Sequence, residues 1–391
     1  MLVVGLFSFC VACTASTPTE DTDWPAQLGD EAPIHQFASV PLEARDPRRV
    51  EIVEDRAIRE ESIAEPLSGS LAVAVGPQGD IAVLDQRAAR VHVVGSDGAF
   101  LRSVGGHGQG PGELARPTLV AVGARRLVVY DHAGNEFKVW TSDGDYVGSH
   151  RVFPRPVTLR QMVVVDDASL VVVYLDLETD GSTSTVVSAI RLGDDTFEEL
   201  LRLPYLPGVV REDGRIVGRD LEASARQPLV AVDFSHSAQI YVVSSATYKI
   251  AAFAFTGAPA WGVSVPTPRV PYPQARMVDD SRRVRMFYPD VPVDAIAFPE
   301  YLPVLAAPTL LVDGHGHLYV FLESGASGDN AQEESEGGVR HVDVYSPLGR
   351  RVFSGSLQGP SWNYARGEYV YRRGRVDENI IVRRFQLHEP F

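Results

Sequence analysis

Two aspartates at equivalent positions are the first residues of this chain that could do chemistry together. Asp85 ends the run IAVLD, and Asp131 ends the similar run LVVYD. Carboxylates at the ends of neighbouring strands can bind a cation such as Ca²⁺, or a sugar hydroxyl. An aspartate in such a place equally caps the turn that follows it, and we expect that structural role. The later repeats do not have an aspartate at this position; their nearest residues are Leu175, Ser244 and Glu323.

Histidines give a second set of candidates. His107 and Gln109 lie in the glycine-rich stretch 105–114 and are placed to meet a ligand; an imidazole there could act as a general base. His315 and His317 form a His-Gly-His pair that invites a metal ion, but they belong to a short turn and no third ligand is evident. We therefore predict no metal site at this pair and no assigned catalytic residue.

The remaining candidates are polar side chains in loops. Asn135 follows Asp131 in one repeat, and Arg276 and Arg282 stand in the arginine-rich segment Gln274–Phe287. Guanidinium groups pair well with anionic ligands. The segment could form a short helix that caps a channel mouth, or a plain solvated helix. Sequence signatures of nucleotide-binding loops, nucleophile elbows, zinc proteases and EF-hands are not found.

The elements that must position these residues repeat along the chain. Residues 71–117 contain four β-like runs separated by Gly/Asp turns: Leu71–Val75, Ile81–Leu84, Val91–Val94 and Phe100–Val104. A shift of 46 residues superimposes them on the next stretch, including Ser96-Asp-Gly98 on Ser142-Asp-Gly144. A period of about 40–50 residues with four strands in each copy is typical of β-propeller blades. One such sheet has two faces to cover and should not fold alone.

Later parts of the chain continue the pattern. Three further sets of four runs lie within residues 162–203, 229–265 and 309–357, and the C-terminus offers only two runs, 368–371 and 380–387. The shortfall matches the surplus run Val50–Val53 before the first repeat. We therefore predict an all-β, six-bladed β-propeller of four-stranded antiparallel blades, its last blade closed by an N-terminal strand.

The linker between the first two repeats carries a resemblance. The run Gly108-Gln-Gly-Pro-Gly-Glu-Leu114 with Pro117 resembles the blade linker of NHL-repeat proteins and related bacterial six-bladed β-propeller lipoproteins. The resemblance implies a six-bladed ring at the cell surface or in the periplasm. The glycines have a physical reason of their own, because the crossing to the next blade needs backbone angles that other residues avoid.

The N-terminus resembles a lipoprotein signal peptide of bacteria. Twelve apolar residues, MLVVGLFSFCVA, precede Cys13, and a polar spacer follows. Such a run is too short to span a bilayer as a helix. We expect residues 1–13 to be this signal, with Cys13 as the lipidated residue, 14–49 to be a linker, and 50–391 to be the propeller; ordinary secretion is the alternative. The membrane is then contacted only through the lipid.

Charge and composition limit the classes of partner. The formal net charge of −15 argues against nucleic acid as a ligand, because phosphate recognition needs a positive surface. With both cysteines in the leader, no thiol remains for a disulfide. Stability must come from packing and ring closure, and we expect a monomer at the cell envelope.

Long connections are predicted to gather on one face. In a four-stranded meander, second-to-third connections and blade linkers leave from the same end, which we call the long-loop face; the other end is the short-turn face. Extra chain falls in the long-loop connections: 105–116, 176–184, 204–228, 266–308 and 323–338. Loops on one end of a rigid scaffold commonly bind ligands. We predict a module that binds a peptide, glycan or protein through this face, without a cofactor. The alternative is a lactonase- or lyase-type enzyme with a divalent cation, such as Ca²⁺, in the central channel.

Overall fold

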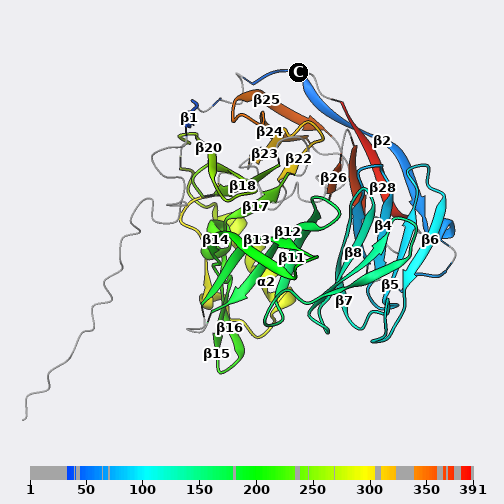
Figure 1. Cartoon of the computed structure of the whole chain (residues 1–391). Coiled ribbons are helices and arrows are strands. Elements are labelled where there is room, and N and C mark those ends of the chain that lie inside the picture. The colour runs from blue at the N-terminus through cyan, green and yellow to red at the C-terminus, as the bar shows by residue number, and fades with distance from the viewer. Residues whose placement is uncertain are drawn as a thin grey trace, which may run out of the picture.

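The computed structural model describes residues 33–38, 40, 45–63, 65–68, 71–178, 182–233, 238–244, 246–267, 269–303, 310–322, 339–358, 364–366, 369–373 and 380–388. They form antiparallel sheets arranged around a common centre (Figure 1). Cys13, the rest of the leader, and the connection 323–338 lie outside the described residues. Among the residues that are described, no helix combines the length and the apolar character needed to cross a membrane.

The first two sheets follow the repeat that the sequence shows. They contain β3 (Leu71–Val75), β4 (Ile81–Asp85), β5 (Arg90–Val94), β6 (Phe100–Gly105), then β7 (Pro117–Val122), β8 (Arg126–Asp131), β9 (Glu136–Thr141) and β10 (Tyr146–His150). The linker between them needs glycine where β6 ends. Gly105 has a φ of 86°, and a Cβ on it would come within 2.8 Å of Leu114 Cδ1. Both the angle and the close approach explain the glycine.

The third and fourth sheets have the same meander. They contain β11 (Thr158–Val164), β12 (Ser169–Leu177), β13 (Thr183–Arg191), β14 (Thr196–Pro204), then β17 (Leu229–Val232), β18 (Gln239–Ser244), β19 (Lys249–Ala254) and β20 (Pro259–Ser264). A fifth strand, β1 (Ile34–Gln36), pairs in parallel with β20. Part of the segment expected to be a linker is therefore strand.

The last sheets are joined at their outer edges. They contain β22 (Leu311–Val312), β23 (Leu318–Leu322), β24 (Val339–Tyr345), β25 (Arg351–Gln358), β26 (Tyr364–Arg366), β27 (Tyr369–Arg373) and β28 (Ile380–His388). The long strand β2 (Arg49–Arg59) pairs in parallel with β25 and antiparallel with β28, and the one-turn helix η3 (Glu60–Ser62) follows it. An N-terminal strand thus completes the C-terminal sheet, as the surplus run Val50–Val53 predicts, over a longer stretch than that run.

Hydrophobic clusters fill the spaces between neighbouring sheets. The cluster between the closing sheet and the first sheet, for example, contains Ile58, Val83 and Val382. Similar clusters join each sheet to the next along the chain. Burial of one such side chain contributes about 1.5–3 kcal/mol, so the faces of each sheet are stabilised by its neighbours. The innermost strands also touch in order, β26 with β3, β3 with β7, and β7 with β11. The all-β propeller class predicted from the sequence is confirmed.

The two long connections before and after the fourth sheet together form a small additional layer. It contains β15 (Val209–Glu212), β16 (Arg215–Asp220), α1 (Leu221–Arg226), α2 (Gln274–Phe287), η4 (Val293–Ala295) and β21 (Ile296–Ala297). Strands β16 and β21 pair in parallel, so the two connections form one body. Its own apolar cluster holds Val284, Val291 and Ile296 together. Helix α2 spans the same residues that the sequence offers as a helix.

Candidate functional site

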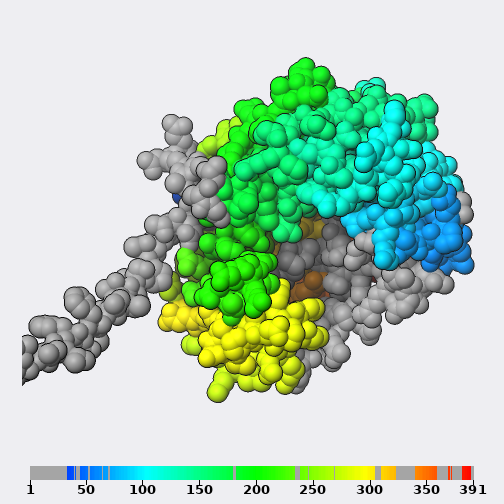
Figure 2. Space-filling view, turned by 90° about the horizontal axis from the view of Figure 1, so that it is seen from below, coloured from blue at the N-terminus to red at the C-terminus, as the bar shows by residue number. Residues whose placement is uncertain are grey.

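The long-loop face carries the additional layer, whereas the described connections on the short-turn face are tight turns. The turns after β3 and β5, for example, are closed by hydrogen bonds from Gly76 N to Asp80 O and from Gly95 N to Ala99 O. Figure 2 shows the region of α2 in yellow and the region of β15 and β16 in green beside a hollow in the surface. The first sheets, in cyan, lie across that hollow.

Asp85 is buried, and both of its carboxylate oxygens accept hydrogen bonds from the chain. Its carboxylate accepts hydrogen bonds from Ser68 N (2.6 Å) and the Ser68 hydroxyl, and from Arg87 N (3.1 Å) and Ala88 N (3.0 Å). Burial alone would raise the pKa of Asp85, but the bonds from Ser68, Ala88 and Arg87 outweigh it and lower that pKa. A carboxylate offers about four lone-pair positions. Asp85 therefore ties the incoming linker to the following turn.

Asp131 does the same in the second sheet. It accepts hydrogen bonds from Ala115 N (2.7 Å), Arg116 N (2.8 Å) and Ala133 N (3.3 Å), and it is buried. The donors again come from the preceding linker and the following turn. The equivalence seen in the sequence is thus a repeated way to anchor the linker, because each carboxylate binds the linker that enters its own sheet.

Asn135 is also buried and structural. Its side-chain oxygen accepts a hydrogen bond from the Tyr130 hydroxyl (2.9 Å), and its amide nitrogen donates to Phe153 O (2.9 Å). His107 and Gln109, in contrast, are exposed in the linker after the first sheet. Backbone bonds from Leu114 N to Gly106 O and from Gly108 N to Leu114 O hold that linker. Of the candidates in the first two sheets, these two side chains are the accessible ones.

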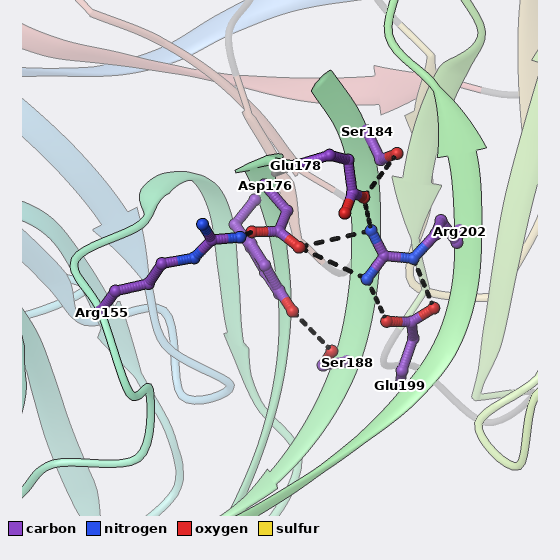
Figure 3. Close-up of polar contacts among 8 residues, drawn as sticks. Arg155, Asp176, Glu178, Ser184, Ser188, Glu199 and Arg202 are labelled. Carbon is purple, nitrogen blue, oxygen red and sulfur yellow. Dashed lines mark hydrogen bonds and ion pairs between the residues drawn. The ribbon is translucent and has the colours of Figure 1, made fainter. Parts of the chain in front are cut away.

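An ion-pair cluster at the long-loop end of the third sheet was not predicted from the sequence (Figure 3). Arg202 of β14 contacts Asp176 and Glu178 from β12 and the turn after it, and binds Glu199 through Nε (2.8 Å) and Nη2 (2.5 Å). Arg155, from the linker before β11, binds Asp176 Oδ1 at 2.6 Å. The cluster thus joins two strands of the sheet to the linker that enters it.

The guanidinium of Arg202 is saturated by carboxylates. Its hydrogen bonds with Glu199 raise its pKa, against the smaller effect of burial. Because its donors point at protein acceptors, Arg202 does not offer them to an anionic ligand. Asp176 and Glu178 stand 26 and 24 positions from Arg202 in the sequence. Strand β13 lies between β12 and β14, and the register of these three strands brings the side chains together.

The surface of α2 contains a groove. It is lined by Val278, Ser281, Arg282, Arg285, Met286, Pro289 and Val293, with a volume of about 460 Å³. Arg282 lies in this groove and pairs with Asp279 at 3.0 Å. Arg276 lies outside it, with its guanidinium 5.7 Å from the centre of the Tyr272 ring and Nε 3.9 Å from Asp280. The two arginine candidates therefore have different surroundings.

The His-Gly-His pair lies on the short-turn face. Asp313 accepts hydrogen bonds from His315 N (2.8 Å) and His317 N (2.9 Å), and its Oδ2 lies 2.9 Å from His317 Nδ1. Asp313 thus organises the turn. Within the part of the chain that the structure describes, no three His, Cys, Asp or Glu side chains are grouped so that they could hold one metal ion.

Comparisons with known proteins give similarity of fold. No family model and no curated protein matches the chain. Among solved structures, a DUF4221 family member from Bacteroides vulgatus matches 88% of this chain and 100% of its own, with a TM-score of 0.51 and 10% identity. For a Bacteroides fragilis protein described as a putative exported protein, the match covers 92% of this chain and 100% of that protein, with a TM-score of 0.47 and 11% identity. For virginiamycin B lyase from Staphylococcus aureus, it covers 87% of this chain and 100% of the lyase, with a TM-score of 0.37 and 8% identity. The first likeness supports the fold alone, and the other two are too distant to support an argument.

Proposed function

We propose that this protein is an exported propeller that binds a peptide, glycan or protein ligand through its long-loop face. The observation that carries the proposal is the asymmetry between the two faces. Two long connections build an extra layer with its own core on one face, and the described turns of the other face are short. Binding surfaces are commonly made from loops that a rigid scaffold holds in place.

The architecture that we infer for this module is a six-bladed ring of the NHL-repeat type. The support is the succession of interfaces, in which each sheet shares a hydrophobic cluster with the next and the closing sheet returns to the first. The glycine-rich linker sequence supports the same inference. A closed ring leaves only short, protected sheet edges and is rigid enough to hold loops in a fixed arrangement.

The cellular location that we propose follows from the leader sequence. A lipid on Cys13 would hold the propeller at the cell envelope as a monomer. Loss of labelled palmitate from the chain on Cys13→Ser substitution tests the anchor, and Cys10→Ser is the matched control. Retained label in the Cys13→Ser variant contradicts lipidation at this residue.

A binding role agrees with the state of the buried polar candidates. Asp85 and Asp131 bind the preceding linkers and the following turns, Asn135 binds Tyr130 and the linker residue Phe153, and Arg202 binds carboxylates. Side chains that are saturated by the protein position loops and do not act on a substrate. The accessible features of the face are exposed loop residues and the groove beside α2.

Blocking each face in turn tests the proposal. The full chain with Cys10 and Cys13 replaced by serine would carry one new cysteine, either Leu177→Cys on the long-loop face or Leu348→Cys on the short-turn face; both leucines are exposed. A polyethylene glycol chain is then attached through maleimide, and binding to peptide and glycan arrays is measured. We expect loss of binding for the adduct at 177 and retention for the adduct at 348. Equal loss from both positions, loss at 348 alone, or no bound array member contradicts the proposal.

A further inference from the structure

We propose that the groove beside α2 binds a peptide segment that carries an acidic residue next to a bulky apolar residue. This inference rests on the proposed function and names a ligand class and a location for it. Four features support it: the side of the helix on which the groove lies, the exposed apolar side chains, the arginines at its rim, and the concave shape.

The groove lies on the side of α2 that faces away from its core. Val284, the buried residue of the helix, packs with Val291 and Ile296. Val278, Arg282 and Arg285 occupy positions spaced by three and four residues, so they share a face on the opposite side. The chain after the helix turns back along this face and supplies Pro289 and Val293 as the second wall.

The walls of the groove leave large apolar side chains in contact with solvent. Val278, Met286 and Val293 are 54%, 68% and 50% exposed. The additional layer has an apolar cluster of its own, and these side chains are not part of it. A contiguous exposed apolar surface with polar residues at its rim is typical of an interaction site. The volume of about 460 Å³ is within the range of pockets that hold a ligand or an anchoring side chain.

The charge at the rim of the groove determines the chemistry of the partner. Helix α2 carries four arginines and two aspartates, in a chain whose net charge is −15. Arg282 pairs with Asp279 at 3.0 Å. Arg285 is exposed and, within the described residues, its side chain makes no hydrogen bond or ion pair. A guanidinium with free donors binds a carboxylate in a bidentate manner, so the partner needs an acidic group beside its apolar one.

The same features favour a peptide over other anionic partners. A nucleic acid would meet the long-range repulsion of the strongly negative chain, whereas a short acidic segment needs only the local positive charge. A membrane surface would contact protruding side chains whether or not they line a groove, and Phe287, which is 74% exposed, protrudes without lining it. A concave site with two apolar walls accommodates one inserted side chain.

The chain offers two matched pairs of substitutions for the test. Arg285→Glu and Arg283→Glu make the same charge change on the same helix, but only Arg285 lines the groove. Met286→Asp and Phe287→Asp each place a carboxylate at an exposed apolar position of the helix, but only Met286 lines the groove. All four side chains are exposed, so folding should persist, and circular dichroism with thermal unfolding confirms it.

The experiment measures fluorescence polarisation of labelled synthetic peptides with the full chain. The probes are a short peptide that alternates Glu and Leu, a version with Lys in place of Glu, and a version with Ser in place of Leu. We expect binding of the first probe alone. Arg285→Glu and Met286→Asp should each weaken it by about tenfold or more, whereas Arg283→Glu and Phe287→Asp should change it by less than about threefold.

Other outcomes overturn the inference. Equal losses from Arg283→Glu and Arg285→Glu indicate a diffuse electrostatic attraction. Binding to vesicles of phosphatidylglycerol and phosphatidylcholine that falls equally in all four variants, without peptide binding, indicates a membrane surface. A dimer in sedimentation velocity that Met286→Asp dissociates, and that the peptide does not compete for, indicates a second copy of the chain as the occupant.

Failure of this inference is distinguishable from failure of the proposed function. If the adduct at 177 abolishes binding to the arrays while Arg285→Glu leaves it intact, the long-loop face binds its ligand elsewhere and only the groove is wrong. If the unmodified chain binds no array member and no probe, both proposals fail together.

Discussion

The hydroxyl of Tyr248 donates a hydrogen bond of 2.5 Å to Asp343 Oδ2 inside the interface between the fourth and fifth sheets. Tyr248 lies in the connection between β18 and β19, Asp343 lies in β24, and both are buried. Ser354 Oγ donates to the other carboxylate oxygen at 2.6 Å. Arg45, from the chain before β2, has Nη1 3.8 Å from the same carboxylate. One buried aspartate thus links two sheets and the N-terminal segment.

Removing the Tyr248 hydroxyl should destabilise the ring. Tyr248→Phe leaves Asp343 with one fewer donor in a buried site, and we expect a loss of about 1–3 kcal/mol in the free energy of unfolding. Chemical denaturation measures the change. Tyr146→Phe is the matched control, because the Tyr146 hydroxyl makes no hydrogen bond within the described residues while its ring packs on Trp140 at 5.6 Å. Equal losses from both substitutions contradict a role for the hydroxyl.

The strand that closes the ring provides a second test. Ile58 of β2 is buried in the cluster shared by the closing and first sheets, and Val53 of the same strand is exposed. Ile58→Ala removes buried methyl groups and leaves a cavity, so we expect a cost of about 2–5 kcal/mol in the free energy of unfolding.

Val53→Ala is the control, with an expected change within about 0.5 kcal/mol. Urea denaturation of both variants gives the comparison. A small effect of Ile58→Ala would mean that the ring is stable without a well-packed closing strand.

Elements that depend on local pattern were predictable from the sequence. Alternating apolar runs with Gly/Asp turns gave the sheets, and the segment Gln274–Phe287 proved to be α2 with the same bounds. The turn-capping role of Asp85 and Asp131 followed from their place at the end of a strand. Each of these features is decided by residues close together in the chain.

Features that depend on long-range contacts were not predictable. In the preceding linker, Asp85 binds the backbone nitrogen and hydroxyl of Ser68, whereas Asp131 binds the backbone nitrogens of Ala115 and Arg116, so the linker contacts differ although the aspartates correspond. Asp343 meets Tyr248 from 95 residues away. The groove of α2 exists because the chain after the helix folds back along it. The periodicity of the sequence carries no information about such long-range contacts.

A buried histidine, His92, and a partly buried one, His341, predict a loss of stability in mild acid. Burial lowers the pKa of His92 and, together with the positive charge of Arg45, that of His341. The unfolded chain therefore binds protons near the ordinary value of 6.5 while the folded chain resists them, so the free energy of unfolding should fall as the pH drops below about 6.5.

Denaturation curves from neutral pH to about pH 5 test this expectation. His341→Gln and His92→Gln should each reduce the slope of stability against pH. His107→Gln is the control, since His107 is exposed in its linker. An unchanged slope in both His92→Gln and His341→Gln would falsify the assignment of the acid sensitivity to these groups.

Arg202 should hold the long-loop end of the third sheet through the shape of its side chain as well as its charge. It reaches Asp176, Glu178 and Glu199 at once, and it binds Glu199 through two nitrogens, a planar bidentate geometry that an ammonium group cannot form. Arg202→Ala leaves three neighbouring carboxylates without their shared cation. Because the cluster is partly exposed, we expect a cost of only about 1–2 kcal/mol in the free energy of unfolding.

The conservative variant separates shape from charge. Arg202→Lys should recover less than half of the stability lost in Arg202→Ala if the bidentate bonds to Glu199 matter, and nearly all of it if charge alone matters. Arg155→Ala, which removes a more exposed arginine bound to Asp176 alone, should change stability by about 0–1 kcal/mol. Thermal unfolding at low and high salt completes the test. Salt weakens the ion pairs of the wild-type protein and also screens the repulsion among the three carboxylates in Arg202→Ala, so the stability difference between the two should shrink as salt is added.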